Sequence, residues 1–132
     1  MKGYMADIEK LTLENEHFRK VLYTGKHLQL VLMSLKPGED IGEETHQNVD
    51  QFFRFEAGAG KCIIDESEYT VHAGDIIIIP AGAKHNVMNT DPALELKLYT
   101  IYSPPNHKEA TIRITKEDAE NKAEEFDGTT TE

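Results

Sequence analysis

The residues of this chain that are best suited to chemistry are two histidines, a glutamate and a glutamine near its middle: Glu44, His46, Gln51 and His85. Glu44 and His46 are two positions apart, so their side chains would share one face of a β-strand. His85 follows a Pro80-x-Gly82 turn that closes a run of four isoleucines, and this turn fixes where the imidazole points. Imidazole, carboxylate and amide ligands suit a divalent first-row metal such as Zn, Mn, Fe, Co or Ni. The four residues therefore predict one such metal ion per chain, held inside a small β-barrel.

Strand parity selects the fourth ligand, because alternate side chains of a strand point to opposite faces. If Gln51 faces inward, the phenylalanines two and four residues later do so as well. If Asp50 faces inward instead, Arg54 and Glu56 also enter the core, where unpaired charges are costly to bury. Gln51 is therefore the expected ligand. A buried Glu44 without a cation would tend to take up a proton, and this cost is the physical argument for a metal.

The segments around these residues have the composition of short strands separated by turns. About nine or ten strands with turn residues at regular spacing are typical of a sandwich or a closed barrel. The expected strands cover residues 18–24, 28–35, 41–46, 49–57, 61–65, 69–72, 76–79, 85–89 and 94–102. The isoleucine run at 76–79 is expected to be buried, and the apolar run at 28–35 is expected to be covered on both faces.

The two ends of the chain are expected to lie outside the barrel. Residues 1–17 form an arm that could end in a short strand. Thr115 and Asp118 resemble a capping box before an apolar stripe, which predicts a short peripheral helix at about 115–126. The last residues, 128–132, are expected to be disordered. The chain of 132 residues has the length of a single domain, with the barrel at about 18–103.

Charge and composition exclude several classes of partner. The formal net charge is −10, which argues against nucleic acid and against an anionic membrane surface. No apolar stretch has the length of a membrane span, and the first residues lack the apolar region of a signal peptide. A cytoplasmic location is the expectation that follows. The single cysteine, Cys62, cannot form an intrachain disulfide and lies in an apolar run, so it is expected to be buried and unreactive.

The motif residues resemble those of the cupins. The second cupin motif, G-x5-P-x-G-x2-H-x3-N, is matched at every fixed position by Gly74, Pro80, Gly82, His85 and Asn89. The first motif, G-x5-H-x-H-x4-E-x6-G, is matched at Gly38, His46 and Gly58, with Glu44 in place of the first histidine and Gln51 in place of the glutamate. The resemblance implies an all-β double-stranded β-helix, the RmlC-like jelly-roll barrel, with a metal at these ligand positions.

Two segments, residues 44–54 and 98–107, resemble a narrower group of small bacterial cupins labelled mannose-6-phosphate isomerase-like. The true type I isomerases of that name bind zinc through a Gln-x-His pair, a glutamate and a histidine. This chain has the same ligand types with Glu44 and Gln51 exchanged. It lacks the helical domain of those larger enzymes, and no phosphate clamp is apparent. The resemblance therefore implies ancestry more directly than activity.

Three functions are compatible with such a site. The first is a metal-dependent, isomerase-like enzyme that acts on a small polar metabolite, with Glu44 as a ligand or as the base. The second is a non-haem iron dioxygenase, in which His46, His85 and Glu44 hold the iron. The third is a non-catalytic module that binds a metal and a small ligand in the barrel. The inward positions that parity assigns are mostly apolar, which favours a small, partly apolar ligand over a sugar phosphate.

The sequence also predicts where the four remaining histidines and Phe52 lie. His17, His27 and His72 are interpreted as surface residues, and His107 as a loop residue rather than a cover of the barrel mouth. Phe52 lies on the strand face opposite Gln51, where it would be exposed in a monomer. Together with the doubly apolar strand, it predicts a homodimer; packing beneath the N-terminal arm is the alternative.

Overall fold

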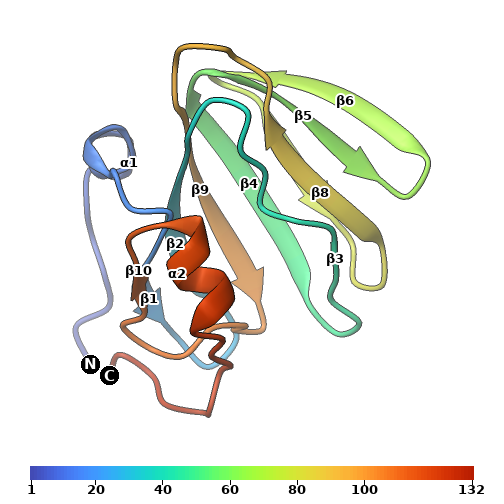
Figure 1. Cartoon of the computed structure of the whole chain (residues 1–132). Coiled ribbons are helices and arrows are strands. Elements are labelled where there is room, and N and C mark those ends of the chain that lie inside the picture. The colour runs from blue at the N-terminus through green and yellow to red at the C-terminus, as the bar shows by residue number, and fades with distance from the viewer.

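The chain folds into two antiparallel β-sheets that pack face to face, with two short helices at their margin (Figure 1). The computed structural model describes all residues, 1–132. The strands are β1 Arg19–Thr24, β2 Gln29–Leu35, β3 Glu44–Thr45, β4 Asp50–Ala57, β5 Ala59–Ile64, β6 Ser67–His72, β7 Ile76–Ile79, β8 Lys84–Asn89, β9 Leu96–Ser103 and β10 Ile112–Arg113. The helices are α1 Ile8–Glu14 and α2 Lys116–Asn121. The larger sheet has the strand order β10-β1-β2-β9-β4-β7, and the smaller has the order β3-β8-β5-β6.

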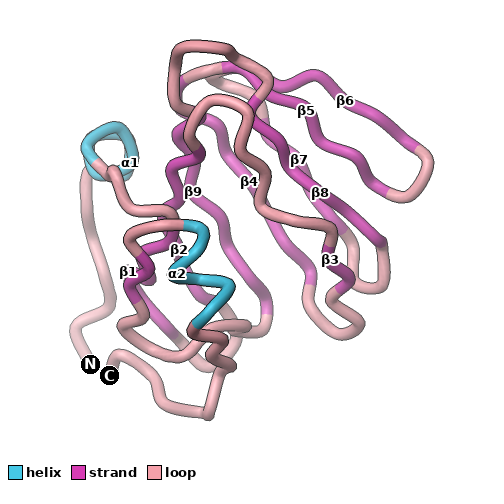
Figure 2. Tube along the Cα trace, viewed as in Figure 1, coloured by secondary structure: helices cyan, strands magenta, loops and turns pink.

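The expected all-β architecture is confirmed, and Figure 2 shows far more strand than helix along the trace. Alternation explains why: along β4 and β9 every second residue is buried, which is the period of a strand with one face on a core. These inward side chains meet those of β5 and β8 in one apolar cluster between the sheets. Cys62 lies in it with no exposed surface, and burial raises the pKa of its thiol to about 11, so this cysteine is inert, as expected.

The isoleucine run is only half buried, which corrects the expectation of a fully covered strand. β7 is an edge strand of the larger sheet, whereas the helix that covers the outer face of that sheet packs on β9, β4 and β2. Ile77 and Ile79 point into the core, while Ile76 and Ile78 are 48% and 59% exposed. Strand β2 does bury almost every residue, because its outer face lies beneath α1.

One glycine joins the two sheets at a point where no side chain fits. Gly58 connects β4 to β5 with a φ of +91°, a conformation that L-residues rarely adopt. A Cβ atom there would lie 2.6 Å from the carbonyl oxygen of Glu95. Glycine at this position therefore permits both the turn and the close approach of the chain before β9.

The N-terminal arm contains a helix where the sequence suggested, at most, a strand. Asp7 caps α1 by accepting a hydrogen bond from the backbone N–H of Lys10 at 3.2 Å. The helix packs on β9, β4 and β2, and the ammonium group of Lys97 on β9 donates to the carbonyl of Asn15. The apolar spacing in this segment is too short to predict a helix from the sequence. The packing of the helix on the sheet is what stabilises it.

The C-terminal segment also differs from the expectation. Thr115 caps α2 as predicted, by accepting from the backbone N–H of Asp118 at 3.0 Å. The helix ends at Asn121, however, and residues 122–126 run on without helical structure. The last residues are ordered: the N–H of Thr131 donates to the carbonyl of Thr24 at 2.8 Å, and the two termini lie side by side (Figure 1).

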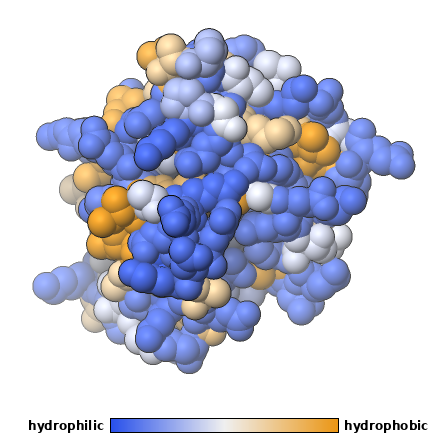
Figure 3. All heavy atoms as spheres, viewed as in Figure 1, coloured by the Kyte–Doolittle hydropathy of each residue, from blue (hydrophilic) through white to orange (hydrophobic).

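The surface on the α2 side is predominantly hydrophilic, with scattered apolar side chains (Figure 3). This agrees with the acidic composition and the net charge of −10. The longer helix, α1, has seven residues, and neither helix is both long and apolar enough to cross a membrane.

Candidate metal centre

Strands β3 and β8 place a carboxylate opposite an imidazole. Glu44 on β3 pairs in register with His85 on β8. The turn that precedes β8 is tied to the same segment, because the N–H of Gly82 donates to the carbonyl of His46 at 2.8 Å. Gly82 has a φ of +91°, so the turn uses the freedom of glycine. The local sequence therefore fixes all three side chains relative to one another.

The structure brings three of the four expected ligands together. Potential ligand atoms of Glu44, His46 and His85 all lie within 4.8 Å of one another. The two imidazole centroids are 5.3 Å apart, and Nε2 of His46 lies 3.2 Å from Oε2 of Glu44. His85 is buried, while the side chains of His46 and Glu44 are 15% and 33% exposed. The cluster thus faces the barrel interior and is open on one side.

His85 is held with one nitrogen free. Its Nδ1 lies 3.0 Å from the carbonyl oxygen of Ala83. A carbonyl can only accept, so Nδ1 carries the proton and Nε2 keeps its lone pair. Nε2 is buried and has no hydrogen-bond partner. Metal-bound histidines commonly use this arrangement, because the hydrogen bond from the second nitrogen fixes the tautomer and the ring orientation.

Gln51 shows the same pattern in its amide. It is 3% exposed, whereas Asp50 is exposed, so the parity prediction is confirmed. Its Nε2 donates to Oγ1 of Thr100 at 3.0 Å, and its Oε1 is buried without a partner. In register, Gln51 pairs with Tyr102, whose ring centroid lies 5.9 Å from that of His46. Gln51 is therefore on the inner face, next to a residue that contacts His46.

Electrostatics keep the carboxylate of Glu44 ionised. Burial by itself raises the pKa of Glu44. The hydrogen bond to His46 and the nearby positive charge of Arg19 lower the pKa by more than burial raises it, so the net shift is downward. The expectation that Glu44 without a metal would take up a proton is therefore wrong, because the site is more polar than parity suggested. An ionised carboxylate and two orphaned buried acceptor atoms form a donor set that suits a divalent cation.

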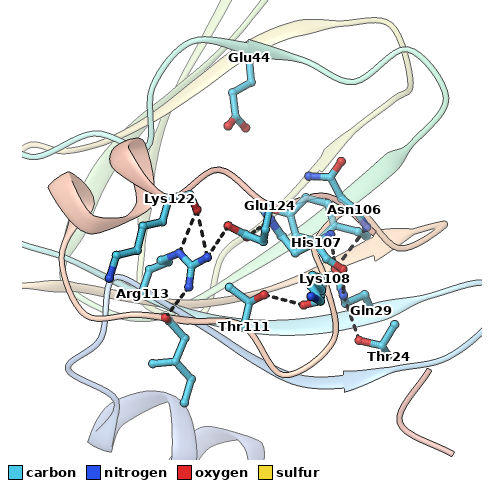
Figure 4. Close-up of polar contacts among 12 residues, drawn as sticks. Thr24, Gln29, Glu44, Asn106, His107, Lys108, Thr111, Arg113, Lys122 and Glu124 are labelled. Atoms are coloured by element: carbon cyan, nitrogen blue, oxygen red, sulfur yellow. Dashed lines mark hydrogen bonds and ion pairs between the residues drawn. The ribbon is translucent and has the colours of Figure 1, made fainter. Parts of the chain in front are cut away.

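A cavity of about 300 Å³ adjoins the cluster. Its lining comes from β1, from the open side of the cluster and from the C-terminal segment: Arg19, Glu44, His46, Asn106, His107, Ala119, Ala123, Glu124 and Glu125. Figure 4 shows the carboxylate of Glu44 pointing toward the segment that carries His107 and Glu124. The mouth of the barrel is thus walled by residues 106–125.

His107 is a wall of the cavity and not an exposed loop residue, which corrects the sequence interpretation. It is 7% exposed. Its Nε2 lies 3.1 Å from the hydroxyl of Tyr102, and its Nδ1 lies 3.1 Å from Oε1 of Glu124 (Figure 4). The other oxygen of Glu124 accepts from Arg113 at 3.0 Å. Burial lowers the pKa of His107 more than Glu124 raises it.

The comparisons with known proteins agree with this architecture. A profile of the Cupin domain family (Cupin_2) matches residues 31–102, which is more than half of the chain. The uncharacterised protein YrkC of Bacillus subtilis is 47% identical over 124 residues; the aligned region covers 89% of this chain and 66% of YrkC. A crystal structure of BH2720 from Bacillus halodurans superposes with a TM-score of 0.89 at 42% identity, covering 92% of this chain and 96% of that one.

A more distant neighbour shows the fold alone. An RmlC-like cupin from Shewanella frigidimarina has a TM-score of 0.59 at 20% identity and covers 65% of this chain and 74% of its own. The chain belongs to the cupin family, as the profile match shows. The sequence motifs, the two facing sheets and the inward histidine cluster agree with this assignment. These comparisons do not confirm the narrower resemblance to the mannose-6-phosphate isomerase-like group, which stays a prediction.

Proposed function

We propose that this cupin binds one divalent transition-metal ion through Glu44, His46, Gln51 and His85 and acts as a metal-dependent enzyme on a small polar metabolite. The observation that carries the proposal is the pair of orphaned acceptors, Nε2 of His85 and Oε1 of Gln51. A buried polar atom without a partner costs about 1–3 kcal/mol. Two such atoms beside an ionised carboxylate and a second imidazole are explained by a cation that all four contact.

The cavity indicates what the surrounding residues contribute. A bound metal would polarise an oxygen atom of a metabolite. Tyr102 is buried beside His46, and burial raises the pKa of its hydroxyl, so it holds its proton at neutral pH. With Nδ1 of His107 donating to Glu124, the hydroxyl donates to Nε2 of His107. This chain of hydrogen bonds supplies a proton-bearing group for isomerase-like chemistry.

Metal content tests the proposal. Protein purified without a histidine tag should contain about one metal ion per chain under metal-replete conditions. His85→Ala removes the buried ligand and should lower the content to about a tenth or less after dialysis. His72→Ala is the matched control, because this histidine is exposed on β6 and should leave the content unchanged. A wild-type chain without metal, or a His85→Ala variant that keeps it, would contradict the proposal.

We also propose that two copies of the chain associate through the outer face of the larger sheet. Four apolar residues lie directly opposite one another across β7, β4, β9 and β2: Ile78, Phe52, Ile101 and Leu30. Helix α1 packs on β9, β4 and β2 and so covers part of this face, but Ile76 and Ile78 stay exposed at the edge. An uncharged row of this kind is self-complementary under two-fold symmetry, even for an acidic chain.

A further inference from the structure

Arg19 is a buried cation that the chain itself does not pair. It is 7% exposed and lines the cavity together with Glu44 and His46. Its Nε is buried without a hydrogen-bond partner. No carboxylate lies within 4.0 Å of its guanidinium group, and its nearest aromatic contact is the ring of Phe18, with the guanidinium carbon 5.4 Å from the centroid. A buried charge in this state is costly unless another group satisfies it.

The carboxylates near Arg19 already have other partners. Glu44 is hydrogen-bonded to His46, and one of its oxygens belongs to the candidate metal cluster. Glu124 divides its two oxygens between His107 and Arg113 (Figure 4). Both carboxylates reduce the energetic cost of burying the Arg19 charge through attraction at longer range. Neither accepts a hydrogen bond from the guanidinium. The open donors therefore face the cavity, where a bound molecule would meet them.

We infer that Arg19 is the anion-binding half of the site and that the ligand is a small carboxylate. Its carboxylate group would bind the guanidinium, while a neighbouring oxygen reaches the metal position. A planar guanidinium matches a carboxylate with two parallel hydrogen bonds. This inference rests on the proposed metal site and specifies which class of metabolite that site takes.

Charge and volume favour a carboxylate over a phosphate ester. Arg19 is the single cationic side chain of the cavity lining, and Glu124 and Glu125 share the same wall. A phosphate dianion would be repelled by these carboxylates about twice as strongly as a carboxylate monoanion. The cavity of about 300 Å³ also suits a metabolite of a few heavy atoms.

Ligand binding to the cobalt-loaded protein tests the inference without an assay of activity. The probes are acetate, lactate and malonate, with acetamide and inorganic phosphate as comparisons. Binding is measured by calorimetry and by the change in the visible spectrum of the bound cobalt. At least one carboxylate should bind and should bind about tenfold or more tightly than acetamide or phosphate. Arg19→Gln should weaken carboxylate binding by a similar factor and leave the weak binding of acetamide unchanged.

The controls separate this inference from the proposed function. Arg54→Gln removes a guanidinium that pairs with Glu56 on β4 and does not line the cavity, and it should keep the preference for carboxylates. If cobalt does not bind to the wild-type chain, the metal site itself is wrong. If cobalt binds but no probe carboxylate is preferred over acetamide, the inference about Arg19 is wrong. That comparison uses the wild-type chain alone, so it stands even if Arg19→Gln fails to fold.

Discussion

Two groups outside the ligand set, a backbone carbonyl and a hydroxyl, prepare the site for a cation. The carbonyl of Ala83 holds His85 by its Nδ1, and the hydroxyl of Thr100 holds the amide group of Gln51. Each contact engages the N–H donor of the ligand side chain and leaves its acceptor atom free for a metal. Such supporting hydrogen bonds keep a site in its binding geometry before the metal arrives.

The Thr100 contact gives a prediction at the residue scale. Thr100→Val keeps the shape of the buried residue but removes the acceptor for the Gln51 amide, whose orientation then becomes free. Metal affinity should fall about tenfold, and the free energy of unfolding should fall by about 1–3 kcal/mol because a buried donor is left unpaired. Chelator competition and thermal unfolding measure the two effects.

A conservative variant serves as the control for this prediction. Thr100→Ser keeps the hydroxyl and should retain most of the metal affinity, and Thr70→Val on the exposed strand β6 should change neither quantity. Wild-type affinity in Thr100→Val would show that Gln51 does not depend on this contact.

The sequence identified the cluster residues because their motif spacing has a geometric meaning on adjacent strands. It did not single out Arg19 or His107. Arg19 shares its parity with the buried Val21, so it could have been placed inward, but an arginine beside a lysine in a short strand suggests an exposed face. His107 follows two prolines in a loop, where no periodicity indicates which way a side chain points.

At the scale of the elements, the C-terminal segment is part of the site. Glu124 forms ion pairs with Arg113, the last residue of β10, and with His107 at the barrel mouth. Arg113 also donates twice to the carbonyl of Lys122, at 3.1 and 3.0 Å. These contacts fix residues 122–126 over the cavity although the segment is not helical. The chain thereby closes its own barrel with a strap, residues 106–126, that contains the ionised carboxylate of Glu124 and the neutral imidazole of His107.

The strap predicts a loss of stability in acid. Folding lowers the pKa of His107 below the ordinary value of 6.5, mainly because the ring is buried, so the unfolded chain binds more protons than the folded one. Its contribution is complete above that value and is lost as the pH falls through it. Glu124 acts in the same direction at lower pH, because its pKa is below the ordinary 4.5. The slope is at most about 1.4 kcal/mol per pH unit for one proton.

Thermal unfolding in the presence of a chelator measures this effect. Between about pH 7 and pH 5, His107→Gln should lose less stability than the wild-type chain, because the variant has no buried imidazole to protonate. His72→Gln changes a histidine whose side chain is 66% exposed, and it should follow the wild-type slope. Equal slopes for His107→Gln and the wild type would show that His107 is not the titrating group.

The strands were predictable because their side chains alternate between buried and exposed with a period of two, and the residue types along the sequence alternate in the same way. The helix α1 and the short strand β10 were not, since each depends on contacts with distant parts of the chain. β10 has two residues and exists through its pairing with Arg19 and Lys20 of β1. The predicted helix at 115–126 stops early because Glu124 forms ion pairs with His107 and Arg113 instead of continuing the helical turn.

At the scale of the whole molecule, two facing sheets place the ligands on one end of the barrel and the apolar row on the outside of the larger sheet. These surfaces are independent, because inward and outward side chains alternate along the same strands. The fold itself was predictable from two motifs, whose glycines and proline set the turns between strands. For the proposed association of two copies, the sequence pointed only to Phe52, since the exposure of Ile76 and Ile78 was not apparent from the residues alone.

Light scattering tests the proposed association. At micromolar concentration the mass should be twice 14.9 kDa. Ile78→Lys places a charge at the exposed edge of the apolar row and should yield the mass of one chain. Leu94→Lys alters a residue that is similarly exposed, at 62%, but lies in the loop before β9, and should leave the mass unchanged. A single-chain mass for the wild type would refute the association.

The central claim is that one cation connects four side chains at the inner end of the barrel. Anomalous scattering from crystals of tag-free protein grown with manganese or zinc tests it most directly. The account predicts a single strong peak at about 2.0–2.2 Å from Nε2 of His85, an imidazole nitrogen of His46, a carboxylate oxygen of Glu44 and Oε1 of Gln51. A peak located elsewhere, or none between His46 and His85, would contradict it.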